Sequence, residues 1–281
     1  MFQQTVLPRW KGFNLLGAFT MDSPGKFEEE DFQLIADLGF DFVRLPLNYT
    51  FWIDYNDPFE INDGKLSIVD DCVNWGEKYG IHVNVALHRA PGYSVAKDRV
   101  EPFDLWRDPE ALEAFKLHWT TLAKRYKGIP STKVSFNMVN EPADVSPEAH
   151  RKVMAETTRA IHAIDPDRLT LCDGLDYGNL PQTNIADMAQ ENVGQSCRAY
   201  IPAGITHYRA LWVDRKRNFP TATWPGGYAA DGPWDRERLF RHYGAWAALA
   251  QNYNMGVHCG EGGCFNQTPH DVTLRWMEDV L

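Results

Sequence analysis

The sequence predicts an α/β protein built as a (β/α)8 TIM barrel, and three observations support that prediction. Short apolar runs alternate with amphipathic segments along the 281 residues, which indicates parallel strands joined by helices. No Gly-rich phosphate turn follows an early run, as would be usual in an open doubly wound sheet. Polar residues end several of the runs, and barrels carry their chemistry at the carboxyl ends of many strands at once. The polar strand ends are Arg44, His88, Asn140, Glu141, Arg198, Tyr200 and Glu261.

Seven apolar runs predict the strands, because each is short and is followed by a segment with a helical pattern. In chain order these strands are expected at residues 12–17, 40–47, 82–88, 134–141, 169–174, 195–201 and 255–261.

The amphipathic segments between the runs predict the helices. They are expected at 28–38, 68–79, 109–127, 147–164, a short one at 185–190, 236–253 and 271–281. Gly39 and Gly80 end the first two, because glycine readily takes the left-handed conformation that closes a helix.

A complete barrel needs eight strand–helix units, and only seven are evident. The sequence ends at Leu281, where an eighth strand should follow. Three explanations are open: a truncated chain, a second polypeptide that completes the barrel, or closure with seven strands. We predict one catalytic domain over residues 1–281, incomplete at its C-terminus, with the edges of the first and last strands open to another chain.

Composition excludes several classes of function. The net charge of −10 argues against a nucleic-acid partner, which needs a basic face. No apolar stretch approaches the length of a membrane span. The first residues lack a signal-peptide pattern, so the protein is expected in the cytoplasm, or secreted with its signal peptide absent from this sequence. The five cysteines form no CxxC pair, and no His/Asp/Glu cluster has metal-ligand spacing, so no metal site is predicted.

Two glutamates are the strongest candidates for chemistry. Glu141 and Glu261 each end an apolar strand, where a buried carboxylate is costly unless it is paired. Either one alone is explained equally well by a structural ion pair. Two of them, with Arg44, His88 and Tyr200 at equivalent strand ends, indicate a catalytic pair.

Four motifs give the chain a likeness to a known family. They are Asn140-Glu141-Pro142, Val43-Arg44-Leu45-Pro46, Ala86-Leu87-His88 and Gly260-Glu261-Gly262-Gly263. Each is weak alone, but their order on successive strands is specific. From about Trp10 to its end the sequence resembles glycoside hydrolase family 5, the cellulase family.

The resemblance implies a role for each matched residue. Glu141 would be the acid/base and Glu261 the nucleophile of a retaining β-glycosidase that needs no cofactor. Arg44 would lie beside Glu261, and Tyr200 would donate a hydrogen bond to it. Asn140 would hold the sugar 2-hydroxyl and His88 another hydroxyl. Retention predicts carboxyl groups about 5 Å apart.

The sequence departs from the family pattern in two places. Arg198 occupies a position that is usually histidine, and arginine cannot accept a hydrogen bond. We expect Arg198 in the site, paired with Glu141 or Glu261, and His207 near it; the alternative is that His207 supplies the imidazole. The missing eighth strand would carry the tryptophan beneath the cleaved sugar. Trp212, on the long loop after the sixth strand, is a candidate sugar platform.

The expected function is retaining hydrolysis of β-glucans or related β-glycosides, as in a cellulase-like endoglucanase. The alternatives are an exo-acting β-glucosidase or β-mannosidase of the same family, and a carbohydrate-binding barrel that no longer cleaves. The expected partner is a β-glycan or oligosaccharide.

Overall fold

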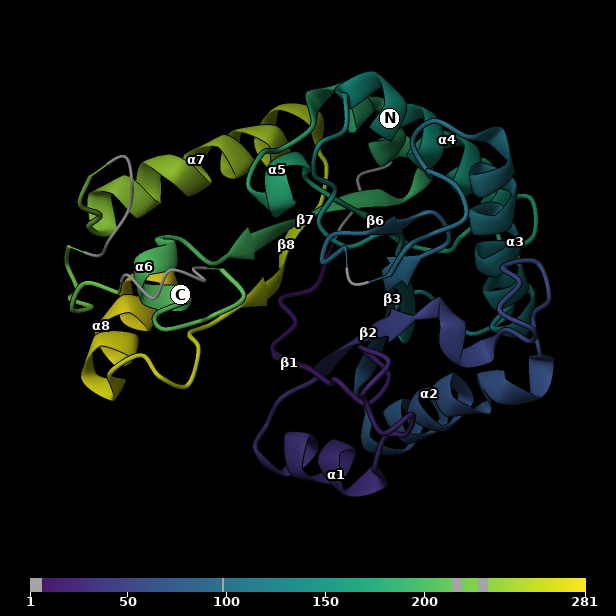
Figure 1. Cartoon of the computed structure of the whole chain (residues 1–281), viewed down its shortest axis with the longest axis horizontal. Coiled ribbons are helices and arrows are strands. Elements are labelled where there is room, and N and C mark those ends of the chain that lie inside the picture. Colours follow the sequence, from purple (N-terminus) through teal and green to yellow (C-terminus); the bar gives the residue numbers. More distant parts are fainter. Residues whose placement is uncertain (1–6, 98, 214–218, 227–231) are drawn as a thin grey trace.

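A parallel sheet forms the centre of the molecule in the computed structural model, which describes residues 7–97, 99–213, 219–226 and 232–281 (Figure 1). Its hydrogen-bonded order is β1-β2-β3-β5-β6-β7-β8, with short β4 antiparallel to β3. The strands are β1 (Gly12–Asn14), β2 (Phe42–Asn48), β3 (His82–Ala90), β4 (Tyr93–Ser94), β5 (Val134–Asn137), β6 (Thr170–Asp173), β7 (Val193–Ala199) and β8 (Val257–Gly262). The nearly closed parallel sheet confirms the predicted barrel class.

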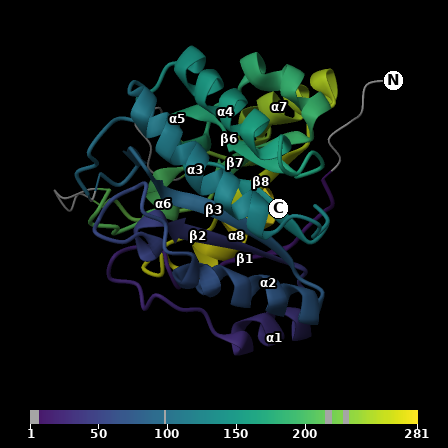
Figure 2. The same ribbon diagram turned by 90° about the vertical axis from the view of Figure 1, so that its right-hand side faces the viewer.

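Helices surround this sheet. The α-helices are α1 (Glu29–Asp37), α2 (Ser67–Tyr79), α3 (Pro109–Arg125), α4 (Pro147–His162), α5 (Leu175–Gly178), α6 (Ala203–Thr206), α7 (Arg236–Tyr253) and α8 (His270–Val280). The 3₁₀ helices are η1 (Tyr49–Trp52), η2 (Asp63–Leu66) and η3 (Thr183–Glu191). Figure 2 shows α1 and α2 on one side of the strands, with α4 and α7 on the opposite side.

Local sequence explains where the helices start and stop. Gly80 closes α2 with φ at +71°, as the sequence predicted, because glycine takes this left-handed conformation without strain. Ser146 begins α4, and its side chain accepts a hydrogen bond from the Ala149 backbone N–H at 3.2 Å. Asp235 begins α7 in the same way.

Three predicted elements differ most from the structure. The strand expected at 12–17 ends at Asn14. The strand expected at 134–141 ends at Asn137, and Glu141 cannot extend it because its φ of +50° is incompatible with a β-strand. The helix expected at 185–190 is the longer 3₁₀ helix η3. The short elements β4, α5, α6, η1 and η2 lie within segments that the sequence pattern left as loops.

The two ends of the strand order, β1 and β8, meet differently from the other neighbours. Among the described residues they share no backbone ladder, and the Asn14 side-chain amide donates to the Gly260 carbonyl at 3.1 Å between them. β8 is partly exposed along its length, whereas β2 and β3 are buried throughout. The expectation of an eighth unit at this position, and of one domain over 1–281, stays a prediction.

Most buried apolar side chains form one core that joins the strands to the helices around them. The side chain of Phe115, from α3, lies in this core with no exposed surface, and the ring of Trp119 packs edge-on against it. A second, smaller cluster lies beneath α6, α7 and α8, and includes Ile205, Trp224 and Trp276. Within the described ranges, no helix combines the length and apolar character that a membrane span requires.

The core makes a direct stability prediction. Phe115→Ala should lower the free energy of unfolding by about 3–5 kcal/mol, because it removes a fully buried ring and leaves a cavity. The matched control is Phe240→Ala on α7, whose side chain is 80% exposed and whose loss should change stability by less than about 0.5 kcal/mol. Urea unfolding of both variants measures the difference. Equal losses would contradict the described packing of α3.

Candidate active site

Two glutamates at the carboxyl ends of strands share one arginine. Glu141 follows β5, Glu261 lies in β8, and Arg198 lies between them on β7. Arg198 Nε lies 3.1 Å from Glu141 Oε1, and its Nη2 lies 3.5 Å from Glu261 Oε1. The two carboxylate side chains are only 16% and 12% exposed. A single guanidinium therefore links both carboxylates in a setting that excludes most water.

Glu261 is surrounded by groups that favour its ionised form. Arg44 Nη1 contacts Glu261 Oε1 at 2.5 Å, and the Tyr200 hydroxyl donates to Oε2 at 3.1 Å. Burial alone would raise the pKa of Glu261, but Arg198 and Arg44 outweigh burial and lower that pKa to about 2. Glu261 is an anion at neutral pH.

Glu141 has the opposite balance. Burial raises its pKa, and Arg198 opposes burial, while the negative charges of Glu261 and Asp173 raise the pKa further. The result is a pKa of about 7. Two carboxyl groups joined by one arginine thus have pKa values that are pushed far apart, which is the arrangement that acid/base chemistry needs.

The backbone of Glu141 is held in an unusual conformation. Its φ of +50° lies in the left-handed region, which is uncommon for residues other than glycine. The Glu141 N–H donates to Asp173 Oδ2 at 2.8 Å, and the Glu141 carbonyl accepts from the Tyr93 hydroxyl at 2.7 Å. These two contacts fix the peptide on both sides, and such maintained strain is typical of functional sites.

Arg44, fully buried on β2, is fixed by three amide side chains. Its Nε donates to Asn137 Oδ1 at 2.9 Å, its Nη1 to Asn14 Oδ1 at 3.0 Å, and its Nη2 to Asn140 Oδ1 at 2.9 Å. These bonds orient the guanidinium toward Glu261 without adding a competing negative charge.

His88 contributes a neutral imidazole on the same side of the site. Burial lowers its pKa to about 3. Its Nε2 lies 3.4 Å from the Asn140 side-chain nitrogen, which can only donate, so Nδ1 carries the ring proton. Nδ1 lies 3.9 Å from Glu261 Oε1, and among the described residues it has no hydrogen-bond partner. This N–H is therefore a buried donor that faces Glu261 and is not used within the described residues.

His207 and Trp212 lie outside the network of carboxylates and arginines. The His207 ring packs edge-on against Tyr200 with ring centres 5.3 Å apart, and His207 Nδ1 lies 2.9 Å from Thr206 Oγ1. The Trp212 side chain is 62% exposed and packs edge-on against Phe265 at 4.7 Å. The structure thus brings seven predicted residues into one network: Arg44, His88, Asn140, Glu141, Arg198, Tyr200 and Glu261.

Four residues of this network were not predicted from the sequence. They are Asn14, Tyr93, Asn137 and Asp173. Asp173 had a signal, because it ends an apolar strand just as Glu141 and Glu261 do. Asn14 and Asn137 carried no such signal, because the sequence of a buried strand does not show which side chains point into the barrel.

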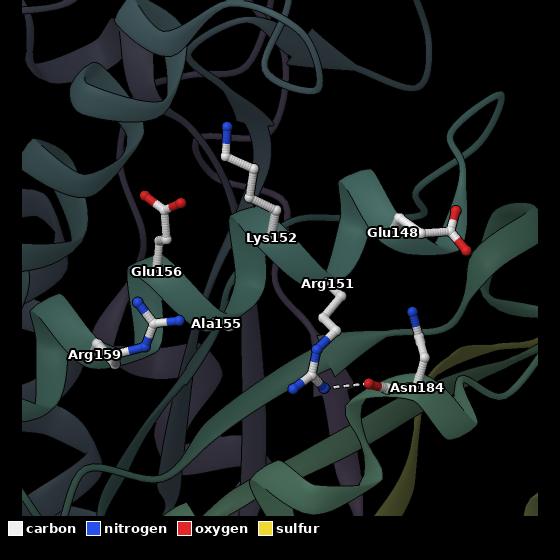
Figure 3. Close-up of a pocket in the computed structure, with 7 residues that line it drawn as sticks. All are labelled: Glu148, Arg151, Lys152, Ala155, Glu156, Arg159 and Asn184. Carbon is white, nitrogen blue, oxygen red and sulfur yellow. Dashed lines mark hydrogen bonds between the residues drawn. The ribbon is translucent and has the colours of Figure 1, made fainter.

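A shallow surface pocket lies elsewhere, between α4 and η3 (Figure 3). Its lining residues are Glu148, Arg151, Lys152, Ala155, Glu156, Arg159 and Asn184. Arg151 points toward Asn184, whose carbonyl it contacts, and it also pairs with Asp187 at 2.6 Å. The pocket carries charges of both signs on an exposed helix face and shares no residue with the glutamate site. In the described part of the chain, no group of three His, Cys, Asp or Glu side chains is placed to hold a metal ion.

Comparisons with known proteins agree with this architecture. The model of the family described as Cellulase (glycosyl hydrolase family 5) matches residues 3–277. Endoglucanase C of Acetivibrio thermocellus is 30% identical over 273 residues, which cover 90% of this chain and 79% of that protein. Cellodextrinase A of Ruminococcus flavefaciens is 28% identical over 267 residues, covering 90% of this chain and 73% of that protein.

Solved structures show the same fold. A crystal structure described as a glycoside hydrolase superposes with a TM-score of 0.90 at 35% identity, covering 96% of this chain and 83% of that one. Endoglucanase Cel5A of Thermotoga maritima superposes with a TM-score of 0.77 at 23% identity, covering 96% and 84%.

Proposed function

The chain belongs to glycosyl hydrolase family 5 and is a glycoside hydrolase acting on O-glycosyl bonds, and from this premise we propose that it cleaves β-linked glucans with retention of configuration. In this proposal Glu141 is the acid/base and Glu261 the nucleophile. The observation that supports it best is the pair of opposite pKa shifts, to about 7 and about 2, in two carboxyl groups that share Arg198.

In the first step, Glu141 donates its proton to the glycosidic oxygen as the bond from that oxygen to the anomeric carbon breaks. The Glu261 carboxylate attacks the anomeric carbon from the opposite face and forms a covalent glycosyl-enzyme. The leaving alcohol departs with the proton. Arg44 and Tyr200, which contact Glu261, keep its carboxylate oriented for attack.

In the second step, Glu141 is ionised and acts as the base. It takes a proton from water as the water oxygen attacks the anomeric carbon, and Glu261 leaves as a carboxylate. Each step inverts the anomeric centre, so the product keeps the starting configuration. Arg198, which reaches both carboxylates, supports the short separation that this route needs.

The neighbouring polar groups suit a sugar. We assign the Asn140 amide to the 2-hydroxyl, where a hydrogen bond strengthens in the transition state. The His88 Nδ1–H would bind a second hydroxyl of the same ring. Trp212, exposed beside His207, would extend the site as an aromatic platform for a neighbouring sugar. The relatives named endoglucanase and cellodextrinase support a glucan substrate.

Product analysis tests the proposed function. The protein should hydrolyse soluble cellulose derivatives and cello-oligosaccharides faster than the matching manno-oligosaccharides. Proton NMR during the first minutes should show the β-anomer of the new reducing end before mutarotation. Initial release of the α-anomer would contradict retention, and release of single glucose units alone would favour exo action.

The two pKa shifts predict the pH dependence of kcat/KM. Glu141 must be protonated to act, so activity should fall as pH rises through about 7. Glu261 must be ionised, and its lowered pKa should keep the enzyme active at pH 4.5, the ordinary pKa of a glutamate. Initial rates on an aryl β-cellobioside between pH 3 and 10 measure both limbs, with circular dichroism as the control for folding. An alkaline limb above pH 9 would contradict the assignment of Glu141.

A further inference from the structure

Arg198 belongs to a buried ion pair that the reaction steps above do not use. Its guanidinium and the carboxylate of Asp173, at the end of β6, are in direct contact, and both residues are at most 1% exposed. Arg198 also donates to Asn140 Oδ1 at 2.8 Å and to Ser196 Oγ at 3.0 Å. We propose that Asp173 and Arg198 act together as positioning residues that set the pH range in which Glu141 and Glu261 work. This inference rests on the proposed function.

Asp173 is placed to hold two parts of the site at once. Its Oδ1 accepts from the Asn137 side chain at 2.8 Å. Its Oδ2 accepts from the Glu141 N–H at 2.8 Å and contacts Arg198 Nη2. One carboxylate therefore fixes both the backbone of Glu141 and the arginine that contacts the Glu141 side chain.

The backbone around Arg198 leaves little free space beside its side chain. A Cβ atom at Gly178 would lie 2.6 Å from Arg198 Cγ, and one at Gly260 would lie 2.8 Å from Arg198 Nη1. Both positions are glycine, so backbone from α5 packs against the aliphatic part of Arg198 and backbone from β8 packs against its guanidinium. Arg198 is consequently confined to the orientation in which it reaches both glutamates.

The charges of the buried side chains show how Asp173 and Arg198 affect the two glutamates. Three carboxyl groups (Glu141, Asp173 and Glu261) surround two guanidinium groups (Arg44 and Arg198). The buried cluster is therefore neutral when it holds one proton. Glu261 contacts both arginines, and Asp173 contacts Arg198 and accepts two further hydrogen bonds. Among the described residues Glu141 has Arg198 as its one side-chain partner, so the proton is best accommodated on Glu141.

Other titratable groups near the cluster carry no charge that changes this count at neutral pH. They are His88, Tyr93, Tyr200 and His258. Burial lowers the pKa of both histidines to about 3 and raises the pKa of both tyrosines. The pKa of Cys259 is lowered, chiefly by a hydrogen bond with Cys197, which makes Cys259→Ser a necessary control.

The count predicts opposite effects for two variants that each remove one charge. Asp173→Asn removes a negative charge, so Glu141 should lose its proton more easily and the alkaline limb of kcat/KM should fall by about one pH unit or more. Arg198→Gln removes a positive charge, so the same limb should rise by a similar amount, and the acid limb should rise with it. Cys259→Ser should leave both limbs in place. Rates on an aryl β-cellobioside across pH measure the shifts.

Two further variants test the proposal if Asp173→Asn or Arg198→Gln folds poorly. Arg198→Lys keeps the charge and should keep the alkaline limb near its original pH, while kcat falls because the forked geometry is lost. Gly260→Ala, whose methyl group would crowd Arg198 Nη1 and Ser196 Oγ, should raise the limb as Arg198→Gln does. Lower activity with unmoved limbs, or limbs that move in the same direction in Asp173→Asn and Arg198→Gln, would overturn the inference.

A second readout separates this inference from the proposed function. Carbon-13 NMR titration of glutamate side-chain carboxyl groups follows the proton on Glu141 without substrate. If the unaltered protein cleaves no β-glycoside, the proposed function fails. The NMR shifts in Asp173→Asn and Arg198→Gln would still support or overturn the role of the pair.

Discussion

Glu261→Gln is expected to lower kcat/KM on β-glycosides by on the order of 10⁴-fold or more. Glutamine keeps the shape of the side chain but has no anionic oxygen to attack the anomeric carbon. The loss should be the same for good and poor leaving groups, because no glycosyl-enzyme can form. Initial rates on cello-oligosaccharides and on aryl β-cellobiosides measure the effect.

The matched control for Glu261→Gln is Glu110→Gln, the same substitution at an exposed position of α3. It should retain full activity. Urea unfolding should show that the Glu261 variant is folded, so that lost activity reports chemistry. Residual activity above about 1% of the original would contradict a nucleophilic role for Glu261, because covalent catalysts lose far more when the nucleophile is removed.

Glu141→Ala should lower activity in a way that depends on the leaving group. General acid catalysis contributes about 10²–10⁴-fold, and its loss matters most when the departing alcohol is a poor leaving group. Cello-oligosaccharides should therefore lose about 10³-fold or more. A dinitrophenyl β-cellobioside, whose leaving group departs without a proton, should form the glycosyl-enzyme at a much less reduced rate.

Added azide distinguishes the role of Glu141 as a base from its role as an acid. The small anion needs no base to attack the glycosyl-enzyme, and the alanine side chain leaves room for it. Added azide should therefore accelerate turnover of the dinitrophenyl substrate by Glu141→Ala and yield a β-glycosyl azide. Equal losses for all leaving groups, or no effect of azide, would contradict the acid/base assignment.

The order of units in the barrel could be predicted because each strand is a short apolar run followed by a helical pattern, and several of the runs end in a polar residue. The residues at which strands end were harder to predict, because functional residues there take unusual backbone conformations. The apolar residues Met138 and Val139 continue the run 134–141, yet the strand stops at Asn137. Glu141 takes a left-handed conformation that Asp173 and Tyr93 stabilise, and no local sequence pattern shows such distant partners.

The candidate site was predictable as a set of strand-end residues but not as a network. Arg198 could be placed near the glutamates from its position in the motif. The charges around Arg198 could not be predicted. Asp173 contacts Arg198 because β6 pairs with β7 and both side chains point the same way, and neither fact can be read from the sequence. The three asparagine contacts of Arg44 have the same origin, since they join β1, β2 and β5 across the barrel interior.

Covalent trapping identifies the nucleophile directly. A 2-deoxy-2-fluoro-β-cellobioside with a dinitrophenyl leaving group slows both steps, and hydrolysis more than formation, so a retaining enzyme accumulates as the glycosyl-enzyme. Mass spectrometry of the intact protein should show one added fluorocellobiosyl group, and the digest should place it on Glu261. Attachment to any other residue, or turnover without attachment, would contradict the assignment of Glu261 as the nucleophile of a retaining glycosidase.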